Sequence, residues 1–147
     1  MNAPRIPRMP QARPAPSSAS SPSRGLRVLA GIAVVFGLMT IVSGGRALFG
    51  GPEARAAVGA AVGFVLGFNF LAGFAYVAAG IGLWRLQRWA AWLALAIAAG
   101  TAIVAAAFAW HVAGGGAYET RTVGALALRL SFWVIAAVVG WRAIVPR

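Results

Sequence analysis

The side chains that could do chemistry in this chain are few. The sequence contains one histidine, His111, two acidic residues, Glu53 and Glu119, and no cysteine. General acid–base catalysis needs a positioned titratable pair, and a metal site commonly needs roughly three or four ligands. These three residues would only just reach that number of metal ligands, and they have no characteristic spacing. A catalytic serine–histidine pair is not expected either, because Ser131 would lie deeper in a membrane than His111. We therefore expect no enzyme, no cofactor, no metal site and no disulfide.

Arginine is the abundant charged residue. All thirteen basic residues are arginines, and the formal net charge is +11 at pH 7. A guanidinium binds carboxylates and phosphates through a planar fork of donors. An anion site could therefore use the arginines Arg46, Arg55, Arg121 and Arg129. Nucleic-acid binding needs a folded basic face, but most arginines lie in the N-terminal segment or at the ends of apolar runs, so we expect no nucleic-acid partner.

The elements that position these residues must lie in lipid. Hydrophobic residues make up 61% of the chain and charged residues 10%, whereas soluble domains are roughly half apolar and a quarter charged. Four apolar runs each have about the 20 residues that a helix needs to cross a bilayer. They span residues 28–49, 58–84, 89–113 and 123–145. We predict an all-α membrane protein, an antiparallel bundle of four transmembrane helices in a domain covering residues 26–147.

The segment 1–25 has a different composition. It holds six of the eight prolines, four arginines and a serine cluster, which predicts a disordered cytoplasmic tail that could contact anionic lipids. Its composition is also that of a transit peptide, although the prolines oppose an amphipathic helix. Alternatively, the first apolar run is a cleaved signal peptide ending near Ala54–Ala56, but it is longer than such segments usually are.

The second and third runs are joined by a short arginine- and tryptophan-rich stretch. Arg85 and Arg88 carry its charges, and Trp84, Trp89 and Trp92 flank them. Indole combines an apolar body with a polar N–H and is enriched at headgroup depth. We therefore predict a tight turn at the membrane surface, anchored by these five residues.

The arginine distribution predicts the orientation. With the N-terminus in the cytoplasm, that side receives nine arginines and no acidic residue, while both glutamates lie outside. Positive charge is retained inside, so both termini should be cytoplasmic. Abundant Ala, Gly and Arg without Lys is typical of GC-rich bacterial genes. We therefore expect a multi-pass protein of the bacterial inner membrane.

The stretch GIGLWRLQRWAAWLALAIA, Gly80–Ala98, also carries a resemblance. It resembles the middle hairpin of small bacterial inner-membrane proteins that have four transmembrane helices and no assigned function. The resemblance implies the same four-helix topology and no activity.

Each run carries a stripe of small or polar residues at helical spacing, which is typical of the packed faces of membrane helices. In the first run the stripe is Ala30, Ala33, Gly37, Thr40 and Gly44. The others are Asn69, Gly73, Tyr76 and Gly80; Ala90, Ala94, Ala98, Thr101 and Ala105; and Thr122, Ala125, Arg129, Ala136 and Gly140. A further stripe, Gly59, Gly63 and Gly67, could pack within the bundle or form the seam of a homo-oligomer.

Three of these residues are candidate polar contacts inside the membrane. Asn69 and Tyr76 lie on the second run, and Arg129 lies on the fourth. The two runs face each other diagonally in an up-and-down bundle. We hypothesise that Arg129 turns inward and bonds Asn69, Tyr76 or Glu119; alternatively, it extends outward to the surface.

A polar cluster is expected on the outer side of the membrane. Its members are Arg46, Glu53, Arg55, His111, Glu119 and Arg121. They could form a cap of ion pairs or part of an anion site.

The expected role is that of an accessory or structural inner-membrane protein, which contacts the lipid bilayer and binds other membrane subunits. The alternative is an oligomeric transporter or channel component. A water-accessible polar path joining Asn69 to Arg129 would favour the transporter, and a dry core of alanine and glycine would favour the accessory protein.

Overall fold

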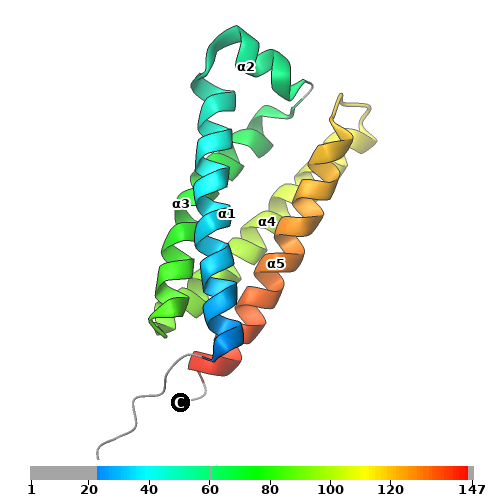
Figure 1. Cartoon of the computed structure of the whole chain (residues 1–147). Helices are drawn as coiled ribbons and strands as arrows, with labels where there is room; N and C mark the ends of the chain where they lie inside the picture. The colour runs from blue at the N-terminus through cyan, green and yellow to red at the C-terminus, as the bar shows by residue number, and fades with distance from the viewer. Residues whose placement is uncertain (1–22, 60, 146–147) are drawn as a thin grey trace, which may run out of the picture.

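The structure is a computed structural model that describes residues 23–59 and 61–145, without the side chain of Arg55. Most of the predicted tail, residues 1–22, lies outside the described residues, so that prediction stays open. The described chain forms five helices: α1 Arg24–Phe49, α2 Gly51–Val58, α3 Gly63–Trp84, α4 Arg88–Ala113 and α5 Thr120–Ile144. All but α2 are long and apolar enough to cross a membrane. The predicted all-α bundle of four antiparallel transmembrane helices is confirmed (Figure 1).

The four long helices do not pack evenly. α1 has its main interface with α3, α4 packs against α5, and α3 packs against α4, whereas α1 and α5 contact each other sparsely. At the end that carries Arg85, all four helices meet around Leu26, Leu83, Ala90 and Ile144. Toward the end that carries α2, α1 and α5 diverge (Figure 1). We call these the Arg85 end and the α2 end, and the line between α1 and α5 the seam.

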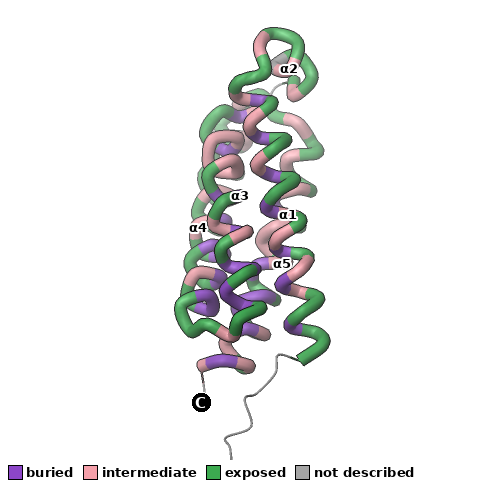
Figure 2. Tube along the Cα trace, turned by 60° about the vertical axis from the view of Figure 1, so that its left-hand side comes forward, coloured by how far each residue is buried: buried purple, intermediate pink, exposed green. Residues whose placement is uncertain are grey.

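Small residues explain the close approach of α1 and α3. A Cβ at Gly37 would lie 2.8 Å from the carbonyl oxygen of Gly73, and one at Gly80 would lie 2.8 Å from the carbonyl oxygen of Ala30. Such contacts are possible only where side chains are absent or minimal. The stripe predicted on the first run is buried, and Figure 2 shows buried positions recurring along the inner side of α1.

The short helix α2 was not expected from the sequence. It has too few residues to cross a membrane, but Pro52 in its first turn and the acidic Glu53 beside it are typical of a helix start. The next helix begins at Gly63 rather than at residue 58, because Gly59 ends α2 with a φ of +63°.

This break corrects the predicted glycine stripe. Gly59, Gly63 and Gly67 do not share one helical face, since only the last two belong to α3. A Cβ at Gly63 or Gly67 would meet no atom of a neighbouring element within 4 Å. These two glycines therefore do not pack within the bundle.

The turn between α3 and α4 lies where the sequence predicts it. The N–H of Gln87 donates to the carbonyl of Gly82 at 2.9 Å, and the N–H of Leu86 donates to that of Leu83 at 3.1 Å. This is a Schellman cap, with Leu86 at φ 53° in the position that usually holds glycine. Arg85 and Arg88 are exposed, as are the three tryptophans Trp84, Trp89 and Trp92.

Candidate functional site

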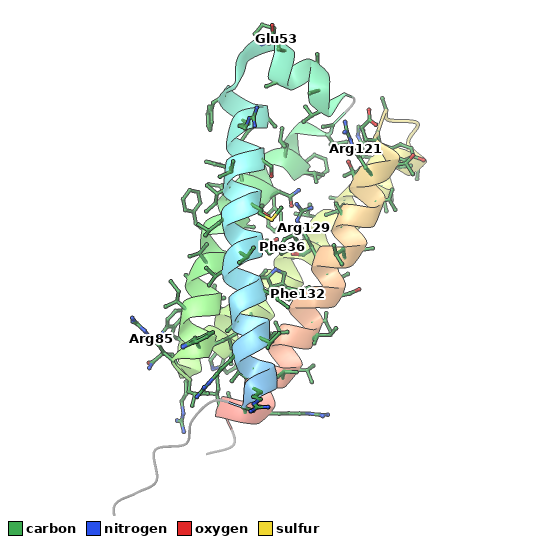
Figure 3. All side chains as sticks on the ribbon, in the orientation of Figure 1. Phe36, Glu53, Arg85, Arg121, Arg129 and Phe132 are labelled. Atoms are coloured by element: carbon green, nitrogen blue, oxygen red, sulfur yellow. The ribbon has the colours of Figure 1, made fainter. Side chains whose placement is uncertain are left out.

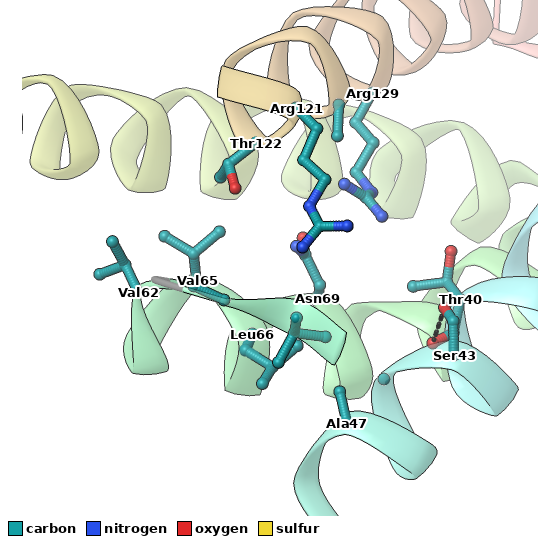
Figure 4. Close-up of a pocket in the computed structure, with 14 residues that line it drawn as sticks. Thr40, Ser43, Ala47, Val62, Val65, Leu66, Asn69, Arg121, Thr122 and Arg129 are labelled. Carbon is teal, nitrogen blue, oxygen red and sulfur yellow. Dashed lines mark hydrogen bonds between the residues drawn. The ribbon is translucent and has the colours of Figure 1, made fainter. Parts of the chain in front are cut away.

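A polar pocket of about 350 Å³ opens between the diverging helices. α1, α3 and α5 form its walls, and the end of α2 borders it (Figure 4). We define this polar pocket by its polar lining residues, which are Thr40, Ser43, Asn69, Arg121, Thr122 and Arg129. Most of its remaining lining is alanine, valine and leucine.

Asn69 and Arg129 share this pocket, as the diagonal arrangement of their helices predicts. Figure 4 shows the side chains of Arg121 and Arg129 reaching from α5 toward Asn69 on α3. The guanidinium carbon of Arg129 lies 5.5 Å from the ring centroid of Phe36 on α1, a cation–π distance. Arg129 therefore turns into the bundle, between α1 and α5 (Figure 3).

The hydrogen bonds predicted from Arg129 to Asn69 or Tyr76 do not form. Asn69 Oδ1 and Tyr76 Oη are buried and accept no hydrogen bond, and Arg129 Nε and Trp133 Nε1 are buried and donate none. The prediction is wrong at this point because the open seam leaves space around the guanidinium, and its face is taken by Phe36. Each unsatisfied buried polar atom costs about 1–3 kcal/mol unless water or a ligand satisfies it.

Four aromatic rings pack together on the Arg85 side of the polar pocket. Phe36 stacks on Tyr76 at 5.7 Å between ring centroids, and Tyr76 lies 4.7 Å from Trp133. Phe132 completes the ring, at 5.3 Å from Trp133 and 6.0 Å from Phe36. We call these four residues the aromatic floor. Tyr76 and Trp133 are fully buried, so the floor lies inside the bundle on the Arg85 side of the polar pocket.

Three members of the predicted outer cluster have described contacts near the α2 end. Arg121 donates from Nη2 to the carbonyl oxygen of Ala57 at 3.0 Å and so holds the end of α2, and the Glu119 carboxylate lies beside Gly59. His111 contacts the carbonyl oxygen of Ala117 at 3.2 Å in its own turn.

For the remaining members of that cluster the prediction stays open. Arg46 and Glu53 are exposed, and the side chain of Arg55 lies outside the described residues. Among the described side chains of the arginines predicted for an anion site, Arg121 and Arg129 line one pocket and Arg46 does not. Within the described ranges, no three His, Cys, Asp or Glu side chains come together as metal ligands would.

Sequence reasoning missed several residues of the site. Ser43 lies on no predicted stripe, and neither do Phe36 and Trp133. Trp133 follows Arg129 by one helical turn and so shares its face, which was a usable signal. Phe36 could not be assigned, because its role depends on how α1 approaches α5 in space.

The resemblance of Gly80–Ala98 to four-helix membrane proteins holds at the level of topology. No family model, curated protein or solved structure matches the chain in the comparisons made with known proteins.

Proposed function

We propose that this protein is a small, non-catalytic accessory protein of the bacterial inner membrane that binds other membrane subunits. The observation that carries the proposal is the closed half of the bundle. Between the aromatic floor and the Arg85 end, Gly80 lets α3 approach the backbone of α1 at Ala30, and a second close contact, between Gly37 and Gly73, lies beside the floor. Together with the buried apolar cluster of Leu26, Leu83, Ala90 and Ile144, this packing favours a binding role over conduction by a single copy.

We propose that the Arg85 end faces the cytoplasm. Among the described residues, that end carries five arginines and no acidic residue, whereas both glutamates lie at the α2 end. The arginines are Arg24, Arg27, Arg85, Arg88 and Arg142. This distribution supports cytoplasmic termini, because positive charge is retained on the inner side of the membrane.

The open glycine face of α3 is where we expect a partner helix. Gly63 and Gly67 have no neighbouring element above them, and paired small residues let helix backbones approach closely. The full chain should therefore co-purify a stoichiometric membrane protein from native membranes in mild detergent. Gly67→Leu should abolish that association, while Gly124→Leu, at an equally open glycine of α5, should preserve it. Purification of the chain without any partner would contradict the accessory role.

A transporter or channel component is the second candidate. It is favoured by the polar pocket, which joins Asn69 to Arg129 and reaches into the bundle. Conduction would require the aromatic floor to open in another conformation or in an oligomer. Solute flux into liposomes that contain only this protein would favour the transporter.

A further inference from the structure

We infer that the polar pocket and a neighbouring apolar groove together bind an anionic single-chain lipid, with its carboxylate or phosphate head in the pocket and its acyl chain in the groove. This inference concerns a ligand of the bundle itself and holds for either candidate function.

The apolar groove follows the seam toward the Arg85 end. It has a volume of about 510 Å³ and lies between α1 and α5. Its lining residues are Val28, Gly31, Ile32, Val35, Phe36, Met39, Leu128 and Phe132. Val28, Met39 and Leu128 are each more than half exposed, so the groove faces the membrane rather than the core. None of its lining residues is charged.

The groove and the polar pocket meet at Arg129. On α5, Leu128 and Phe132 line the groove, and Arg129 between them lines the pocket. On α1, Met39 lines the groove and the next residue, Thr40, lines the pocket. A molecule lying along the seam would therefore pass from a charged environment to an apolar one within one turn of each helix.

The polar pocket suits an anionic head. It holds two guanidinium groups, and no acidic side chain is among its described lining residues. Arg129 Nε has no acceptor, and a guanidinium binds carboxylate or phosphate oxygens through paired donors. Asn69 can add a donor from its amide group. Arg121 stands nearer the α2 end, where it also bonds the Ala57 carbonyl. An anion held here would be stable below the bulk headgroups because its charge is paired.

The groove suits one acyl chain. From Val28 to Met39 it follows α1 for about 17 Å at 1.5 Å per residue. This length is close to half of the roughly 30 Å hydrocarbon core. Gly31 gives the chain room, since a Cβ there would meet nothing within 4 Å. A leucine at this position would occupy the groove without disturbing the helix contacts.

Photolabelling of the full chain in phosphatidylcholine nanodiscs tests this inference. The probe is palmitate with a diazirine in the middle of its chain, and the matching probe is the uncharged alcohol. We expect palmitate to label Val28–Met39 and Leu128–Phe132 in preference to the lipid-facing residues Leu71 and Ile103, and unmodified palmitate to compete. The alcohol should label all exposed surfaces alike. Equal labelling of the seam by both probes would overturn the assignment of a charged head.

Substitutions test separately how the lipid head and its acyl chain are bound. Arg129→Gln should reduce seam labelling by about tenfold to a hundredfold, the worth of a hydrogen bond to a charged group. Gly31→Leu should reduce seam labelling as strongly, although the charge of Arg129 is intact. Because Gly31 has open surroundings, this variant keeps the test valid if Arg129→Gln fails to fold. Arg46→Gln and Gly124→Leu, which touch neither cavity, should label like the natural chain.

Two other occupants are distinguished by the same measurement. If inorganic phosphate or acetate at the probe's own concentration displaces palmitate, the pocket takes a small soluble anion and the lipid assignment is wrong. If Gly31→Leu instead abolishes association between copies of the chain and leaves labelling unchanged, the groove is a protein interface.

Discussion

At the scale of single residues, Arg129 is the side chain on which the site depends. It lies about 14 Å along α5 from Thr120 at 1.5 Å per residue. Its guanidinium rests against Phe36, and its Nε makes no hydrogen bond. A charge at the centre of a membrane helix costs about 2.5–3.5 kcal/mol on insertion scales. A charge kept at such a cost, with an aromatic ring as its described contact and an unbonded Nε, is typical of a binding function rather than of packing.

Arg129→Leu should therefore stabilise the bundle while it removes ligand binding. The apolar side chain removes the buried charge and can pack against Phe36. Thermal unfolding in detergent, without added lipid, should show a melting temperature at or above that of the natural chain, and palmitate labelling should fall to background. Arg46→Leu, at the exposed end of α1, should leave labelling unchanged. A lower melting temperature for Arg129→Leu would mean that Arg129 is a structural residue.

At the scale of the elements, the α1–α3 interface is the most tightly specified contact. Gly37 faces the backbone of α3, whereas Gly31, in the same helix, faces open space. Two glycines of one helix therefore have opposite roles. The first permits contact between helices, whereas the second contacts no other helix and adds only backbone freedom to the stability of the bundle.

Alanine at these two positions should have effects of opposite sign. Gly37→Ala should destabilise the protein by about 1–3 kcal/mol, because the new methyl group forces the helices apart. Gly31→Ala should be neutral or stabilise it by up to about 1 kcal/mol, the difference in helix propensity. Thermal unfolding of both variants in the same detergent measures the two changes in stability. Equal changes in stability for Gly37→Ala and Gly31→Ala would show that the α1–α3 interface can adjust to an added methyl group.

The sequence predicts the four long helices well because lipid imposes them. An apolar run in hydrocarbon must satisfy its own backbone, so its length and composition determine its structure. The short helix α2 could not be predicted in this way. Its formation depends on Pro52 and on contacts to Arg121 that form only in the folded protein.

The polar pocket could be predicted only in part. The order of the helices predicts that Asn69 and Arg129 face each other. It does not predict the cavity between them. The space exists because α1 and α5 diverge, and their separation depends on how closely Gly37, Gly73 and Gly80 draw α1 toward α3. Interhelical distance is a property of whole interfaces and has no local signature in the chain.

At the scale of the whole molecule, the two ends differ in charge, which predicts how the chain crosses the membrane. The natural sequence has no cysteine, so single cysteines can report each side. In intact bacterial cells, Ala117→Cys should react with a membrane-impermeant maleimide, and Gln87→Cys should react only after the cells are opened. Both residues are exposed and lie in connections between helices. The reverse pattern would invert the proposed orientation.

The pairing of α1 with α3 has a consequence for biosynthesis. Both helices are synthesised before α4 and α5, so their main contact needs neither of the later helices, whereas the wall that carries Arg121 and Arg129 belongs to α5. A nascent chain that ends after α4 thus has Asn69 but no cation beside it. Binding capacity should arise only once α5 has been made, so a chain truncated before α5 would insert into the membrane yet capture no lipid.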